Sequence, residues 1–132
     1  MIVVDTSAVV ALLTDEGRLG QFVAATLTAN ETAHPSLMPY EVVNALRSMC
    51  VRGALADSVA DRALRNITTF PGIVFEFEEL ARRAWQLRHN LTTYDAAYVA
   101  LAEMIDCPLL TLDRRLVAAT GTQCRFVDVP VA

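Results

Sequence analysis

The chain has 132 residues, 54% of them hydrophobic and 20% charged, which predicts one globular domain and excludes a disordered tail, a collagen-like fibre or a low-complexity linker. No apolar run reaches the roughly 18 residues of a membrane-spanning helix, no secretory signal is visible, and three unpaired cysteines indicate reduced thiols, so we expect a single cytoplasmic domain over residues 1–132 with no membrane contact. The net charge is −4 and all 11 bases are Arg, so the chain is not an obvious nucleic-acid binder unless metal ions offset several of its 15 acids.

Short apolar runs alternate with amphipathic stretches along the first half of the chain. A β-branched run predicts a strand, and apolar residues at three- and four-residue spacing predict helices. In chain order we expect a strand at 2–4, a helix capped by Ser7 and ending at Leu13, a helix at 16–27, a weak strand at 32–34, a helix from Pro39 to about Gly53 and a helix at 57–70.

The second half continues the alternation after the break at Pro71-Gly72. We expect a strand at 73–75, a helix at 78–91, a helix from Thr92 or Thr93 to about Ile105, a strand at 108–112, a short helix at 114–120 closed by Gly121 and a final strand at 125–127.

The predicted strands are apolar without polar alternation, which is typical of a mostly parallel sheet with helices on both faces. The chain is therefore expected to be an α/β protein. Ligands in such folds bind beyond the carboxyl ends of the strands, and this is where chemistry-bearing residues are expected.

Four acids fall at strand ends or helix starts. Asp5 and Asp113 follow predicted strands, and Glu41 and Asp95 lie in the first turns of predicted helices. If they converge on one crevice, their oxygens suit a hard divalent cation such as Mg²⁺, which lowers the pKa of a bound water and offsets charge on a phosphate. The spacing therefore raises the hypothesis of a metal site.

Each of these acids also has a structural interpretation. Asp5 is compatible with a turn or cap, but no Gly, Pro or Asn follows it, which favours function. Asp95 would complement a helix dipole, but it enters a strongly apolar helix and needs a partner. For Glu41, a solvated position in the first turn of a helix is as plausible as a functional role. For Asp113, a helix cap is as plausible as a functional role.

Four short motifs occur in order along the chain. They are Ile-Val-Val-Asp5-Thr6-Ser7-Ala8, then Glu41-Val-Val-Asn44-Ala-Leu, then Thr-Tyr-Asp95-Ala-Ala-Tyr-Val-Ala-Leu-Ala, and finally Leu-Leu-Thr111-Leu-Asp113. Over residues 2 to 129 the chain resembles a PIN-domain ribonuclease, specifically a VapC-type toxin of a toxin–antitoxin pair.

The resemblance implies a three-layer α/β/α fold and a site in which Asp5, Glu41, Asp95 and Asp113 bind Mg²⁺, or Mn²⁺ in its place, and cut RNA. It also implies supporting roles for the polar side chains beside these acids, namely Thr6, Ser7, Asn44 and Thr111. Some relatives carry a further acid after the fourth one, where this chain has Arg114 and Arg115. Because of that difference, whether the site binds one metal ion or two stays open.

The resemblance further implies an RNA substrate, a cognate VapB-type antitoxin and a homodimer. A haloacid-dehalogenase-type phosphatase and a response-regulator receiver both need a Lys, which this chain lacks. The alternative that stays open is a catalytically inactive PIN-like module that binds RNA or a partner protein.

Overall fold

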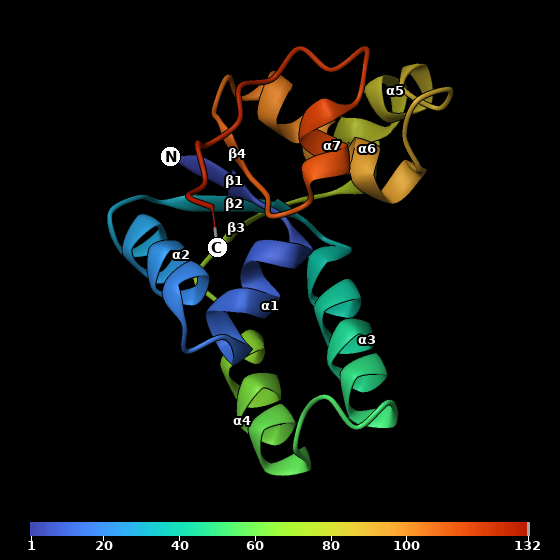
Figure 1. Ribbon diagram of the computed structural model, residues 1–132. Helices are drawn as coiled ribbons and strands as arrows, with labels where there is room; N and C mark the ends of the chain where they lie inside the picture. Colours follow the sequence, from blue (N-terminus) through green and yellow to red (C-terminus); the bar gives the residue numbers. More distant parts are fainter. Residues whose placement is uncertain (132) are drawn as a thin grey trace.

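A parallel four-stranded sheet lies between two layers of helices in the computed structural model, which describes residues 1–131 (Figure 1). The strands stand in the order β3-β2-β1-β4 and comprise β1 (Ile2–Val4), β2 (Thr32–Pro35), β3 (Ile73–Phe75) and β4 (Leu109–Leu110). The helices are α1 (Thr6–Thr14), α2 (Arg18–Thr28), α3 (Met38–Val51), α4 (Asp57–Thr68), α5 (Phe77–Gln86), α6 (Thr93–Met104) and α7 (Arg114–Ala118). Helices α1 to α4 cover one face and α5 to α7 the other, which confirms the three-layer α/β/α prediction.

The core lies on both faces of β1, the central strand. Val3 and Val4 are fully buried, and β1 pairs in parallel with β2 and with β4. On one face α6 packs against the sheet, and its residues 96–102 are all buried because the helix is apolar around its whole circumference. Within residues 1–131 no helix combines the length and the hydropathy needed to cross a bilayer.

The parallel arrangement determines where the polar residues gather. Since β1 and β4 are neighbours that run in the same direction, the residues that follow them lie at one edge of the sheet. Asp5 follows β1, and Thr111 and Asp113 follow β4. The chain leaving β2 enters α3 at the same edge, which places Glu41 in the first turn of that helix.

The predicted strands at 108–112 and 125–127 are shorter in the structure. Ladder pairing in β4 ends at Leu110 because the next backbone N–H groups bond to side chains: the Leu112 N–H donates to the Ser7 hydroxyl at 2.9 Å. With so short a neighbour, the predicted last strand is reduced to a single bridge between Leu109 and Phe126.

Two helix boundaries also differ from the predictions. The first helix begins at Thr6, and its cap is Asp5 rather than Ser7, because the Asp5 carboxylate accepts the Ala8 N–H. The helix predicted at 78–91 ends at Gln86, since the following residues form tight turns and Thr92 is extended to cap α6.

Helices α1 and α2 approach each other closely at Gly20. A Cβ at this position would lie 1.8 Å from the backbone oxygen of Asp15 and 3.1 Å from that of Ala11. Backbone atoms cannot rotate away as a flexible side chain does. The packing of α1 on α2 therefore requires glycine here.

Replacing Gly20 with Ala is expected to destabilise the protein by about 1–3 kcal/mol, because the methyl group overpacks this contact. In a helix the same change ordinarily stabilises by up to about 1 kcal/mol. Gly17→Ala is the matched control, since its Cβ would meet a side-chain oxygen of Asp15 at 3.0 Å and no backbone atom. Urea unfolding of both variants measures the difference, and a Gly20→Ala protein as stable as the parent would contradict the close approach.

Candidate active site

Asp5, Glu41, Asp95 and Asp113 line one hollow of about 510 Å³ at the carboxyl edge of the sheet. They arrive from the end of β1, the first turn of α3, the first turn of α6 and the segment after β4. The structure thus brings together the four acids that the sequence singled out, while their roles as ligands stay a prediction.

Asp5 is buried and held by three donors. Its Oδ1 accepts the Ala8 N–H at 3.1 Å and the Ser7 hydroxyl at 2.6 Å, and its Oδ2 accepts the Thr111 hydroxyl. Burial raises the pKa of Asp5, the three hydrogen bonds act in the opposite direction, and the nearby charge of Asp95 raises it further. Asp5 is therefore both a helix cap and a member of the acid cluster.

The same hydroxyls connect the ends of β1 and β4. The Ser7 oxygen accepts the Leu112 N–H, and the Thr111 oxygen accepts the Asp113 N–H at 3.0 Å. Asp113 in turn caps α7 by accepting the Arg115 N–H at 2.9 Å. Ser7 thus lines the hollow and Thr111 contacts Asp5 from outside its lining, while their supporting roles stay predictions. Asp113 both caps α7 and belongs to the acid cluster, the two positions that its spacing left open.

Glu41 is held by two hydroxyl groups from distant segments. Its Oε1 accepts the Thr6 hydroxyl at 2.8 Å and the Tyr98 hydroxyl at 2.6 Å. Thr6 was predicted for the site, whereas Tyr98 was missed. The available signal was that Tyr98 lies one helical turn after Asp95 in an apolar helix, where a buried phenol needs a polar partner.

Asp95 lies half-buried at the start of α6. The Thr92 hydroxyl caps this helix by accepting the Asp95 N–H at 3.2 Å. Burial raises the pKa of Asp95, and the negative charges of Asp113 and Glu41 raise it further. The hollow thus carries mutually repelling carboxylates.

Asn44 lies outside this hollow. It lines an apolar groove between α3 and α4, and the structure gives it no hydrogen bond to Glu41. Along α3 the hollow is lined by Ala45 and Ser48, which lie four and seven residues after Glu41. Asn44 lies three residues after Glu41, so its side chain is rotated about the helix axis towards α4. Asn44 therefore does not support Glu41 by a hydrogen bond in this structure, and its predicted supporting role stays a prediction.

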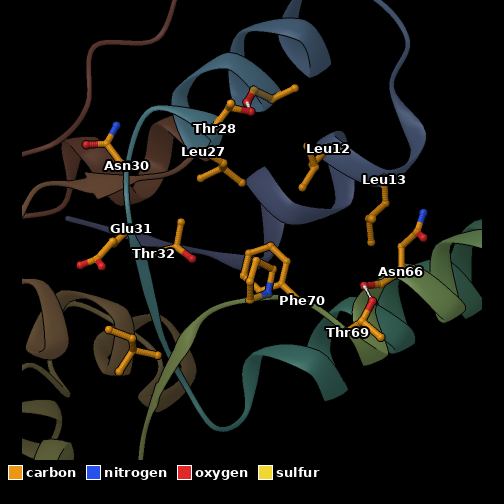
Figure 2. Close-up of a pocket in the computed structure, with 13 residues that line it drawn as sticks. Leu12, Leu13, Leu27, Thr28, Asn30, Glu31, Thr32, Asn66, Thr69 and Phe70 are labelled. Carbon is orange, nitrogen blue, oxygen red and sulfur yellow. Dashed lines mark hydrogen bonds between the residues drawn. The ribbon is translucent and has the colours of Figure 1, made fainter.

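A second and larger hollow lies on the α1–α4 side of the sheet. It has a volume of about 720 Å³, and Figure 2 shows Leu12, Leu27 and Phe70 among its lining residues. Glu31 is its single acid among the residues that the structure describes. This hollow offers apolar contact rather than a cluster of catalytic groups.

The donor chemistry of the acid hollow fits a hydrated divalent cation. Within the described part of the chain, no three His, Cys, Asp or Glu side chains converge closely enough to enclose an ion by themselves. Mg²⁺ does not require such a cage, because it keeps several waters and takes one or two carboxylates directly. Carboxylates whose pKa values are raised by burial and, to a smaller extent, by one another's charges are suited to receive positive charge.

Four carboxylates thus lie at the carboxyl edge of a parallel α/β sheet, where ligands bind in this class of fold. The sequence matches the PIN domain family over residues 2–121. Ribonuclease VapC9 of Mycobacterium tuberculosis (strain ATCC 25618 / H37Rv) is 40% identical over 136 residues, which cover 98% of this chain and 99% of that protein. The chain therefore belongs to the PIN-domain family, among the VapC ribonucleases.

Solved structures share the fold. The crystal structure of PAE2754 from Pyrobaculum aerophilum matches with a TM-score of 0.66 and 30% identity, over 92% of this chain and 81% of that one. A toxin–antitoxin complex from Klebsiella pneumoniae matches with a TM-score of 0.59 and 17% identity, over 92% and 93% of the two chains.

Replacing Asp95 with Asn is expected to stabilise the metal-free protein at pH 7 by on the order of 1 kcal/mol. The gain is limited because water reaches this half-buried side chain and screens its charge. Because the folded-state pKa is raised above the ordinary 3.8, the parent loses stability as the pH rises from that value through the raised pKa. The advantage of the variant should therefore grow over that interval.

Melting curves in EDTA from pH 4 to pH 8 measure this advantage. Asp61→Asn, at an exposed position on α4 outside the acid hollow, is the matched control. An Asp95→Asn protein that is less stable than the parent at pH 7 would indicate a structural acid instead.

Proposed function

We propose that the protein is a divalent-metal-dependent ribonuclease that hydrolyses RNA phosphodiester bonds and acts as the growth-inhibiting toxin of a toxin–antitoxin pair. The observation that carries this proposal is the convergence of Asp5, Glu41, Asp95 and Asp113 on one hollow. The identity with VapC9, itself a ribonuclease, supports the reaction class.

In this proposal Asp5 and Asp95 hold Mg²⁺ or Mn²⁺ directly, and Glu41 and Asp113 complete the shell directly or through water. The bound ion supplies activation of water and neutralisation of charge on the phosphate. The hydroxyls on Asp5 and Glu41 fix the carboxylates before substrate arrives, which lowers the cost of organising the site.

An RNA strand has a cationic contact at the rim of the hollow. Arg52, at the end of α3, lines the hollow and donates to the Ser48 hydroxyl at 3.2 Å. It lies 11 residues beyond Glu41, or about 16 Å along the helix, so the phosphate that it contacts is not the one being cut. Guanidinium groups suit phosphates through paired hydrogen bonds. Arg115, by contrast, lies 3.6 Å from the Asp113 carboxylate.

RNA cleavage is expected to require Mg²⁺ or Mn²⁺ and to stop in excess EDTA. Asp95→Asn should lower the rate by at least about 100-fold because a direct ligand is lost, whereas Asp61→Asn should cut at the parental rate. A gel assay on total RNA, with sequencing of the new 5′ ends, measures both. Cleavage that persists in chelator contradicts the metal mechanism, and intact RNA under all conditions favours the inactive PIN-like binding module.

We further propose a cognate antitoxin that covers an apolar groove beside the site, in a cytoplasmic complex with a homodimer of this chain. The groove runs between α3 and α4, and exposed apolar side chains line it, with Tyr40 82%, Val43 38% and Leu64 45% exposed. It begins in the turn that carries Glu41, so a basic side chain of the antitoxin can reach the acids. The Klebsiella toxin–antitoxin complex has the same fold, which is consistent with this arrangement.

Expressed alone, the protein is expected to arrest growth, and co-expression with the neighbouring small reading frame should relieve the arrest and yield a complex that co-purifies.

Leu64→Ser should weaken the complex by at least about 10-fold, since it removes apolar area from the groove. Val51→Ser is the matched control, because Val51 is exposed at the far end of α3 and outside the groove. Light scattering reports the mass of the free toxin, and a monomer would contradict the dimer.

A further inference from the structure

Tyr98 connects the helix of Asp95 to the helix of Glu41. Its side chain is 2% exposed, and its hydroxyl donates to Glu41 Oε1 at 2.6 Å across 57 residues of sequence. The same hydroxyl lies 2.7 Å from the Thr6 hydroxyl, which also reaches Glu41 Oε1. Three separate helices thus meet at one carboxylate oxygen.

The two hydroxyls distinguish the two oxygens of Glu41. An ionised carboxylate only accepts, so Tyr98 is the donor in its bond to Oε1, whether Thr6 donates to Glu41 or to the phenol oxygen. Oε2 has no hydrogen bond from any residue in the described range 1–131, and Glu41 lines the acid hollow. Oε1 is therefore anchored to the protein, and Oε2 is free for a ligand.

The anchoring of Glu41 resembles that of Asp5. Ser7 and Thr111 hold Asp5, and Thr6 and Tyr98 hold Glu41, in each case through hydroxyls that leave the carboxylate charge in place. Helix α1 contributes one hydroxyl to each pair, Ser7 to Asp5 and Thr6 to Glu41. The second donor to Glu41 is Tyr98, which comes from the opposite helix layer. The long phenol ring provides that reach, and it stays packed in the core.

We propose that Tyr98 is a positioning residue: together with Thr6 it fixes the Glu41 carboxylate so that Oε2 is offered to a divalent cation, or to its bound water, in the acid hollow. This inference rests on the function proposed above, and it names a residue that acts through Glu41 without touching the ion. Partners of this kind typically change metal affinity by 10–100-fold when they are removed.

Tyr98→Phe tests the proposal because it removes one oxygen and keeps the ring. Calorimetric titration of the RNA-free protein with Mn²⁺ alone should show affinity 10–100-fold weaker than the parent. Tyr94→Phe is the matched control: it makes the same change four residues earlier on α6, at a side chain that is 63% exposed, and should bind Mn²⁺ like the parent. Circular dichroism verifies that each variant is folded.

A second comparison separates positioning from general packing. In a Glu41→Gln background, Tyr98→Phe should change Mn²⁺ affinity by less than about 2-fold, because the carboxylate that it orients is already gone. Thr6→Val should reproduce the weakening in the parent background, and it replaces Tyr98→Phe as the test if that variant does not fold. An equal loss in both backgrounds, or no loss in either single variant, overturns the inference.

The outcomes also separate this inference from the proposed function. A parent protein that binds Mn²⁺ and cuts RNA, beside a Tyr98→Phe protein that matches it in both, overturns the role of Tyr98 alone. A parent that neither binds Mn²⁺ nor cuts RNA overturns the proposed function and the positioning role with it.

Discussion

Repulsion among carboxylates that share one hollow is the constraint around which this end of the protein is organised. Arg115, 3.6 Å from the Asp113 carboxylate, offsets part of that repulsion, but a cation beside every acid would cancel the negative potential that attracts a metal ion. The structure instead holds Asp5 and Glu41 with hydroxyl groups, which fix carboxylates and leave their charge in place. Burial raises the pKa values of Asp5 and Asp95, and the charges of the neighbouring acids raise them further.

The parallel sheet supplies the framework that brings these groups together. Because β1 and β4 are adjacent and run in the same direction, Asp5 and Thr111 reach the same edge and bond to each other. The rigid core beneath them consists of fully buried valines and leucines in β1 and β4. Small deviations in that core would shift the acids relative to one another, so packing and chemistry are coupled at this edge.

Much of the fold could be predicted from the sequence because local pattern and tertiary environment agree. The run Ile2–Val4 is buried on both faces, and residues 96–102 of α6 are apolar all around, as in a helix that packs between a sheet and another helix, here α5. The acids Asp5 and Asp95 were recognisable because each interrupts such an apolar pattern. The motif resemblance then added Glu41 and Asp113, whose spacing alone left them open.

Other features depend on contacts that spacing does not encode. The partner of Tyr98 lies 57 residues away on another helix, so only the fold reveals their bond. The last predicted strand shrank to one bridge because β4 ends at Leu110, and the Leu112 and Asp113 N–H groups beyond it bond to the Ser7 and Thr111 hydroxyls. Asn44 fell outside the hollow because a three-residue step along α3 turns it towards α4.

The bond between Asp5 and Thr111 also bears on how the protein is made. These residues are 106 positions apart, and a chain is synthesised from its amino terminus. The strand that carries Asp5 is the centre of the sheet, yet one of its two neighbours, β4, comes from the end of the chain. A nascent chain on the ribosome therefore lacks the assembled site until the residues that follow β4 have emerged, so partly synthesised copies do not contain it.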